Sequence, residues 1–291
     1  MNSYLMIVVA DFFLATSFVF QKKYQKTAGT TLKAGLTYNT WMGIFCAVMF
    51  FVMNNFRINL TAYSVMMSAF STITGMLYVF IGFKILEMGN VAHYTFFLMS
   101  GGMVLPYIFG VLFLNEELTL LRTIGLVAIV AAIAISNTGE KKLGRKPLLL
   151  CIAVFVLNGL CSIVSKLHQI SPASELITSS DYAFLVVVWK VVLCSISLLV
   201  IGKRCPGEKI VKLPMKTAIW VILFAAVSDG LSYVLQLAGA STVPASVLFP
   251  MVTGGSVILT SLAGTLVFQE RLSGRQVLGI IICFAGTLLF L

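Results

Sequence analysis

The chain alternates between long apolar segments and short polar connections. Ten segments each hold roughly the 20 apolar residues that a helix needs to cross the hydrocarbon layer of a bilayer. They cover residues 3–21, 32–53, 62–83, 90–114, 119–137, 147–166, 181–201, 215–237, 243–268 and 274–291. The runs are continuous rather than alternating, and they exceed the 9–11 residues of a barrel strand. They therefore predict an all-α integral membrane protein with ten transmembrane helices.

The composition favours the same class of protein. The 291 residues are 59% hydrophobic and 10% charged, and the mean hydropathy is +1.01. A soluble domain carries about 25% charged residues and could not bury this much apolar surface. The first segment lacks a basic leader and a small-residue cleavage site, so we expect a retained span rather than a signal peptide.

The second half of the sequence repeats the first. Four blocks recur in the same order: Lys22 with Lys166; Trp41 and Cys46 with Trp189 and Cys194; Gly75, Tyr78 and Val79 with Gly230, Tyr233 and Val234; and Gly110, Glu116 and Gly125 with Gly264, Glu270 and Gly279. We interpret residues 1–139 and 147–291 as two five-helix repeats joined by a basic linker, 140–146. Because five is odd, the second copy must insert upside down, which is the inverted-repeat design of many secondary transporters.

Positive charge is unevenly distributed over the connections. Those after the first, third, fifth, seventh and ninth segments hold sixteen Lys and Arg residues, and the opposite side holds three. The positive-inside rule then places both termini outside the cytoplasm. The net charge of +10 is explained by these loops and their contact with lipid headgroups, so we expect no nucleic-acid partner.

The end of the chain resembles a known family. Pro244-Ala245, Pro250, Phe268-Gln269-Glu270-Arg271-Leu272, Gly279 and Gly286 are similar to the ending of EamA-type members of the drug/metabolite transporter superfamily, and Leu114-Asn115-Glu116-Glu117-Leu118 is a weaker counterpart. The resemblance implies a ten-helix carrier in which helices 3, 4, 8 and 9 line a central cavity and helices 5 and 10 are peripheral. It also implies cytoplasmic termini, against the loop charges. Relatives carry solutes from amino acids to drugs, so it implies no particular substrate.

The eighth segment carries the most informative polar pattern. Asp229, Tyr233 and Gln236 stand at i, i+4 and i+7 and share one helix face. A carboxylate, a phenol and an amide on one face could orient a polar solute. The alternative is a hydrogen-bonded seam between helices.

Two further charges lie inside apolar segments, where a charge costs roughly 2.5–3.5 kcal/mol. Lys190 could bind a substrate carboxylate or phosphate, or pair with Asp229 or Asp11. Asp11 is the candidate for proton coupling, because burial favours the neutral form of a carboxyl group. An acidic residue in helix 1 also resembles the small multidrug-resistance branch. The alternative for both residues is a fixed structural pair.

Other residues are weaker candidates. Tyr78 is the repeat mate of Tyr233, and both are expected at the pocket. Tyr94 and His93 near the start of the fourth segment are also assigned to the site, although His93 could instead lie at headgroup level. Glu116 and Glu270 precede helices 5 and 10, where a carboxylate complements a helix N-terminus, and we interpret them as structural.

The sequence contains no enzyme signature, and its six cysteines lack metal-ligand spacing. We therefore expect no catalytic activity, cofactor or metal. The prediction is a secondary transporter in a bacterial cytoplasmic membrane, monomeric or homodimeric. It moves an amino-acid-like metabolite or polar amine by alternating access, with proton coupling as an option. The alternatives are a proton-coupled exporter of hydrophobic cations, and a non-transporting scaffold or sensor.

Overall fold

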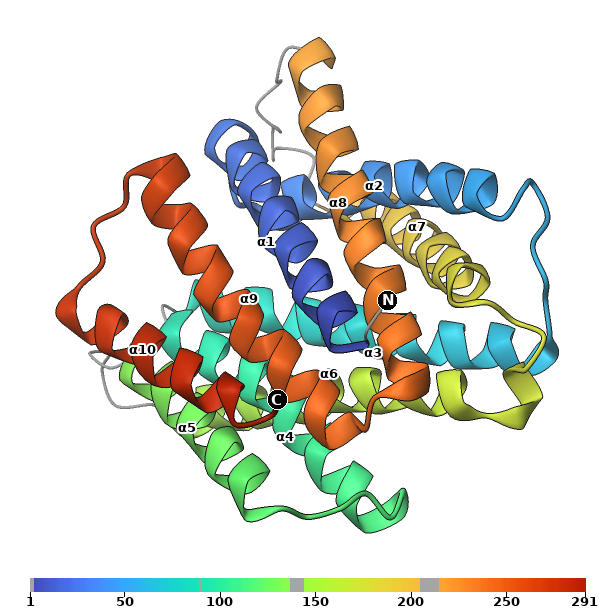
Figure 1. Ribbon diagram of the computed structural model, residues 1–291. Coiled ribbons are helices and arrows are strands. Elements are labelled where there is room, and N and C mark those ends of the chain that lie inside the picture. The colour runs from blue at the N-terminus through green and yellow to red at the C-terminus, as the bar shows by residue number, and fades with distance from the viewer. Residues whose placement is uncertain (1–2, 89–90, 137–143, 205–214) are drawn as a thin grey trace.

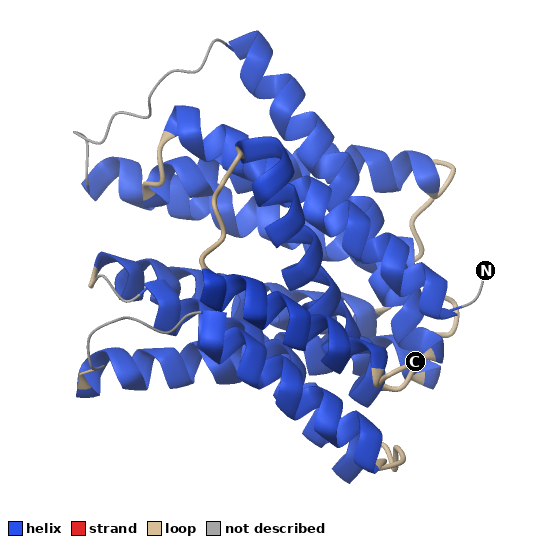
Figure 2. Cartoon of the chain, turned by 60° about the vertical axis from the view of Figure 1, so that its left-hand side comes forward, coloured by secondary structure: helices blue, strands red, loops and turns tan. Residues whose placement is uncertain are grey.

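A computed structural model describes residues 3–88, 91–136, 144–204 and 215–291. Within these residues there are ten α-helices and no strand (Figures 1 and 2), which confirms the predicted fold class. The helices are α1 (Ser3–Ala28), α2 (Leu32–Met53), α3 (Ala62–Glu87), α4 (Val91–Phe113), α5 (Leu120–Ser136), α6 (Arg145–Ile170), α7 (Ser179–Arg204), α8 (Met215–Thr242), α9 (Ala245–Phe268) and α10 (Gly274–Leu288), with a 3₁₀ turn at Pro172–Ser174.

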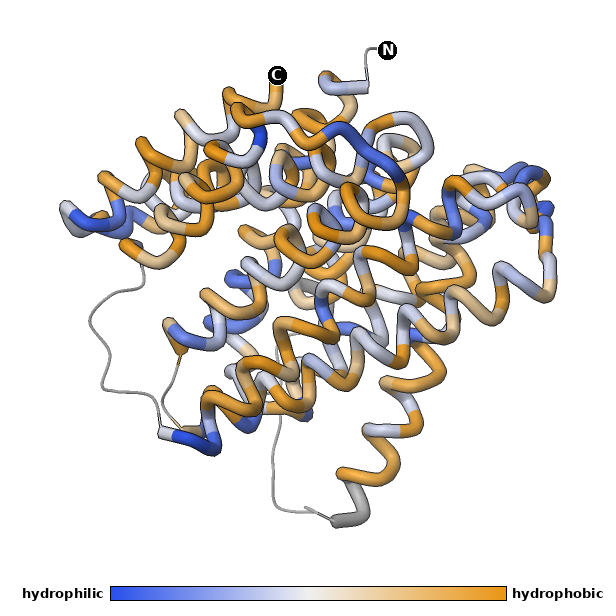
Figure 3. Tube along the Cα trace, turned by 90° about the horizontal axis from the view of Figure 1, so that it is seen from below, coloured by the Kyte–Doolittle hydropathy of each residue, from blue (hydrophilic) through white to orange (hydrophobic). Residues whose placement is uncertain are grey.

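Eight of these helices are long and apolar enough to cross a membrane, and α5 and α10 are shorter apolar helices of 17 and 15 residues. Hydrophobic residues run along the helices, and hydrophilic ones concentrate towards the helix ends (Figure 3). Large apolar side chains such as Phe12, Met66 and Leu266 are exposed. In water this surface would be unfavourable, so it is the surface that faces lipid.

Several helices extend beyond the predicted apolar runs. α1 continues from residue 21 to Ala28, and α8 continues from residue 237 to Thr242. Hydropathy marks the membrane-buried part of a helix, whereas backbone hydrogen bonding continues into the polar region. The predicted linker 140–146 lies partly outside the described residues, and its last two residues form the start of α6.

Polar side chains fix where several helices begin. Thr31 accepts a hydrogen bond from the Ala34 N–H (3.2 Å), and Thr61 accepts one from the Ser64 N–H (3.1 Å). Ser273 and Gln276 form a reciprocal capping box at α10. These side chains satisfy N–H groups that the first helical turn leaves unpaired.

The two halves make matching contacts with each other. α1 packs on α8 and α9, and α6 packs on α3 and α4, which is the same arrangement with the halves exchanged. α2 packs on α7, and α5 packs on α10. Gly125 and Gly286 lie at the α5–α10 crossing, where an added Cβ on either would meet the other's carbonyl oxygen at 2.8 and 3.0 Å.

The bundle has two ends that differ in charge. The beginning of α1 and the end of α10 lie at one end (Figure 2), which we call the terminal end and which also holds the α2–α3, α4–α5, α6–α7 and α8–α9 connections. The opposite end is the basic end, defined by Lys22, Lys23, Lys26, Lys33 and Lys84 at the ends of α1, α2 and α3.

Candidate functional site

A cavity of about 670 Å³ lies between the halves and reaches the basic end. Its walls come from α1, α2, α3, α7 and α8, with single residues from α4 and α6. Exposed Thr30 and Thr31, in the connection between α1 and α2, line its outer part. The resemblance implied walls from helices 3, 4, 8 and 9. α9 instead packs against α1 and α4, and α1, α2 and α7 take a larger share of the wall.

Two opposite charges face this cavity. Asp229 of α8 and Lys190 of α7 both line it, and they are close enough for their charges to interact. Among the described residues, no ion pair within 4.0 Å joins them, since the only such pair is Lys22–Glu270. A solute in the cavity can therefore contact both charged side chains.

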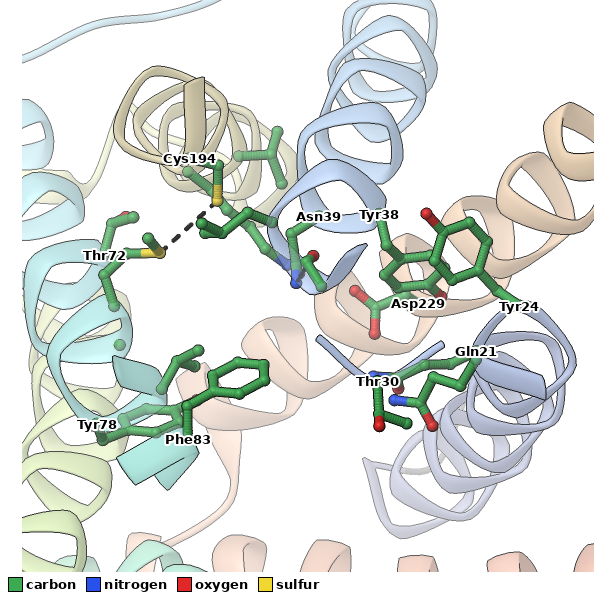
Figure 4. A pocket seen from close by; sticks show the side chains of 18 of the residues that line it. Gln21, Tyr24, Thr30, Tyr38, Asn39, Thr72, Tyr78, Phe83, Cys194 and Asp229 are labelled. Carbon is green, nitrogen blue, oxygen red and sulfur yellow. Dashed lines mark hydrogen bonds between the residues drawn. The ribbon is translucent and has the colours of Figure 1, made fainter. Parts of the chain in front are cut away.

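Five tyrosines surround the two charges. Tyr24, Tyr38, Tyr78, Tyr94 and Tyr233 come from five different helices and all line the cavity. The rings of Tyr24 and Tyr38 lie 4.9 Å apart, next to the Asp229 carboxylate, and Tyr78 lies with Phe83 on the opposite wall (Figure 4). Tyrosine rings offer both an apolar face and a hydroxyl group, so the wall suits a solute with mixed polarity.

Smaller polar and sulfur groups complete the wall. Asn39 lines it and donates to the Gly35 carbonyl (2.9 Å). The Cys161 thiol lies 3.2 Å from the Ser71 hydroxyl, and Cys194 donates to the Met76 sulfur at 3.7 Å (Figure 4). No group of three or more His, Cys, Asp or Glu side chains able to hold a metal occurs in the described part of the chain.

The structure gathers most, but not all, of the predicted site residues. Asp229, Tyr233, Lys190, Tyr78 and Tyr94 line the main cavity. Gln236 lines a second cavity of about 120 Å³, to which Tyr233 and Cys161 also contribute. There Gln236 donates to the Ser232 hydroxyl (2.9 Å). Tyr233 lines both cavities, whereas Gln236 lines only the smaller one.

His93 and Asp11 lie outside both cavities. His93 is half-buried at the start of α4. Asp11 is only 3% exposed, and its Oδ1 has no hydrogen-bond partner in the structure as described. It faces Gly255 of α9, where an added Cβ would lie 2.8 Å from the Asp11 Cγ. The absence of a side chain at position 255 therefore makes room for the carboxyl group.

We expect Gly255→Ala to lower stability by about 1–3 kcal/mol, because the new methyl group overpacks the α1–α9 contact. Thermal unfolding in detergent measures the loss. In an Asp11→Ala background the same change should cost less, since the colliding group is absent. Gly274→Ala is a matched control, because a Cβ there meets no atom within 4 Å. Equal losses in both backgrounds would contradict the assigned contact.

Sequence reasoning missed part of the cavity wall. Tyr24 lies beyond the apolar run that marked helix 1, and Tyr38 belongs to a segment whose one charged residue, Lys33, stands at its very start. The one available signal was the polar spacing of Gln21, Tyr24 and Gln25, which stand at i, i+3 and i+4 on the helical extension of α1.

The terminal end of the bundle is closed by hydrogen bonds. His168 is fully buried between the rings of Tyr63 and Tyr182, and its Nε2 lies 2.8 Å from the Ser64 hydroxyl. The Asp181 carboxylate accepts from the Asn59 backbone and side chain at 3.3 and 3.4 Å. These contacts join α3, α6 and α7 beyond the cavity, so access is from the basic end.

Comparison with known proteins gives the family. A solved crystal structure, whose title names no function, matches with a TM-score of 0.76 and 12% identity over 99% of this chain and 96% of that chain. At this identity the likeness shows the fold alone. No curated protein sequence matches. Residues 145–291 match the EamA-like transporter family, which is half of the chain and is the half in which the motif residues lie. The chain therefore belongs to the EamA-like transporter family, within the drug/metabolite transporter superfamily, and is an integral membrane protein of the transporter type.

Proposed function

We propose that this protein is a secondary transporter of the bacterial cytoplasmic membrane that moves an amino-acid-like metabolite or a polar amine by alternating access. The observation that carries the proposal is that Asp229 and Lys190 face one cavity without forming a direct ion pair within the described structure. An unpaired charge inside the membrane is costly, and a bound zwitterion offsets this cost by supplying a countercharge to each residue.

The size and charge of the cavity limit the class of solute. A volume of about 670 Å³ is in the range of small-molecule sites, roughly 300–1,000 Å³. Among the described residues that line the wall, Lys190 is the single cation, so a polyanion would find too few partners. An ammonium group can approach Asp229 and the tyrosine rings beside it, and a carboxylate can approach Lys190.

The tyrosine wall favours a second candidate, export of hydrophobic cations. Five phenol rings in a cavity with one carboxylate could bind an organic cation without help from Lys190. Asp11 is the candidate proton site in either scheme, because it is buried and one of its oxygens has no described partner. A scaffold or sensor with charges locked in fixed pairs is less well supported, since the cavity charges are not paired in this way.

The proposal is tested by a thermal-stability screen of the purified protein against amino acids, polar amines and aromatic cations. A ligand that binds only the folded state stabilises it by about 2.7 kcal/mol at 100 times its Kd. We expect stabilisation by an amino acid or polar amine, and loss of that effect in both Asp229→Asn and Lys190→Met. Glu87→Gln is the matched control, because Glu87 is exposed and lies outside the cavity.

The outcomes separate the candidates. Stabilisation by aromatic cations that is lost in Asp229→Asn but kept in Lys190→Met would favour the cation exporter. If no ligand stabilises the wild type, and both variants are simply less stable, the two charges have a structural role and the site assignment is wrong.

A further inference from the structure

Two pairs of repeat mates, Lys22 with Lys166 and Glu116 with Glu270, occupy equivalent places but have different partners. We propose that these four residues form two clamps that engage in turn. One clamp closes the terminal end of the bundle, and the other closes the basic end when the first releases. This inference rests on the proposed alternating access and names the residues that would carry it out.

The clamp at the terminal end is engaged. Lys166 of α6 is 5% exposed, and its Nζ donates to the carbonyl oxygens of Ala240 (2.6 Å) and Val243 (2.7 Å). Glu116 accepts from the backbone N–H groups of Ala245 (2.6 Å) and Ser246 (2.8 Å). The ammonium group thus holds the end of α8, and the carboxylate holds the start of α9.

This pairing matches the electrostatics of helix ends. The last carbonyl groups of a helix lack intrahelical partners and carry partial negative charge, and the first N–H groups carry partial positive charge. Lys166 and Glu116 each meet the complementary end, and their charges also attract each other. Hydrogen bonds to charged groups are about twice as strong as neutral ones, so the turn between α8 and α9 is held firmly against α6 and α4.

The turn that holds Glu270 at the basic end has the same local structure as the turn that holds Glu116 at the terminal end. Asn115 and Gln269 share a left-handed backbone, with φ of 52° and 54°. Each following glutamate N–H bonds back to a glycine carbonyl, Glu116 to Gly110 (3.1 Å) and Glu270 to Gly264 (3.3 Å). The two turns therefore present their carboxylates in the same way.

The partners at the basic end are different. Glu270 pairs directly with Lys22 at 2.5 Å, and the Lys22 ammonium group lies 4.8 Å from the centre of the Phe268 ring. The two side chains are 39% and 47% exposed, and exposed ion pairs contribute little to stability. No described hydrogen bond joins either side chain to the end of α3 or the start of α4, which correspond to the ends held by Lys166 and Glu116.

The mouth of the cavity lies where this second clamp is missing. Gln21, Tyr24 and Gln25 of α1 line one side of the mouth, and Phe83 and Leu86 of α3 line the other. Lys22 is next to Gln21. By the spacing that relates Tyr78 to Tyr233, the mates of Ala240 and Val243 are Ile85 and Met88 at the end of α3. If Lys22 bound carbonyl groups there, as Lys166 does in the other half, α1 and α3 would close the mouth.

The two clamps therefore predict that substitutions of the two equivalent lysines, Lys22 and Lys166, shift the balance between the two states in opposite directions. Loss of Lys166 removes only the terminal-end clamp and favours the state that is closed at the basic end. Loss of Lys22 removes the clamp needed by the state that is closed at the basic end. In the state described here, the same change breaks only the weak, exposed ion pair with Glu270. Each change should shift the ratio of the two states by about tenfold, as expected from one to two charge-assisted hydrogen bonds.

The distance across the mouth tests this directly. Spin labels on Gln25→Cys and Glu87→Cys, both exposed at the ends of α1 and α3, report the width in protein whose six native cysteines are replaced by alanine. We expect Lys166→Met to increase the short-distance population and Lys22→Met to decrease it. Glu116→Gln is a milder version of the first change, in case Lys166→Met does not fold.

Lys23→Met is the charge-matched control, because Lys23 is exposed beside Lys22 and should leave the distances unchanged. Shifts in the same direction for both mates, or no shift in either, would overturn the proposal. The measurement needs no transported solute. A failure of the substrate assignment would leave it unaffected, whereas opposite shifts would support the clamps whatever the solute is.

Discussion

Gly101→Ala is expected to cost this protein more stability than an added methyl group at the other helix glycines that the structure describes. Gly101 of α4 packs directly against the backbone of α6, where an added Cβ would overlap the Phe155 carbonyl oxygen and lie 2.7 Å from its Cα. Gly159 of α6 lies at the same crossing, with its own added Cβ 2.8 Å from the Gly101 oxygen. Small residues at such crossings let membrane helices approach closely.

Because the obstacle is backbone, no side-chain rotation relieves it, and the helices must move apart. We expect a loss of about 3 kcal/mol or more, at the upper end of the range for overpacking, measured by thermal unfolding in detergent. Gly75→Ala is the matched control, since a Cβ there makes only an ordinary contact at 3.9 Å. A Gly101→Ala protein as stable as the Gly75→Ala protein would show that α4 and α6 do not cross this closely.

Removal of the Asp181 carboxylate is the second change with a large expected effect. Asp181 is 1% exposed and accepts from the Thr178 N–H (3.0 Å) and hydroxyl (2.8 Å), while the Thr178 hydroxyl accepts in turn from the Asp181 N–H (3.1 Å). This is a capping box at the start of α7. Its bonds to Asn59 tie the same residue to the α2–α3 connection.

We expect Asp181→Ala to lower stability by about 2–4 kcal/mol, because it removes a helix cap and leaves the part-buried donors of Thr178 and Asn59 without their charged acceptor. Asp181→Asn should cost less, since the amide oxygen still accepts. Glu175→Ala removes the same charge from an exposed position nearby and should have no measurable effect. If Asp181→Ala and Glu175→Ala unfold at the same temperature, the carboxylate does not hold the terminal end.

Both substitutions lie in parts of the bundle where the helices are closely packed or joined by hydrogen bonds. The terminal end is joined by Asp181, His168 and Lys166, whose polar atoms are bonded within the protein. The cavity wall differs, because its two charges lack a direct ion pair in the described structure. A closed end and a wall with available charges are what the proposed alternating-access mechanism requires in the solute-free state.

The two charges of the cavity wall could be predicted, because charge inside an apolar run has few explanations. Asp229 and Lys190 were identified for this reason, and Tyr233 was identified because helical spacing puts it on the same face as Asp229. The same spacing suggested Gln236, which lies in the smaller cavity behind Tyr233. Periodicity gives the face of a helix, but it does not say how far along that face the cavity extends.

Sequence alone determined that the chain is a ten-helix membrane bundle, and it predicted that the bundle consists of two related halves. The reason is that the length of an apolar run decides whether a helix can cross the bilayer, and that repeated motifs are found by comparing one part of the sequence with another. Only the tertiary structure decided which helices form the cavity, that Asp11 lies against Gly255 rather than in that cavity, and that two equivalent lysines have different partners. These facts depend on how helices distant in sequence pack, and in a duplicated chain the same motif can have either of two partners.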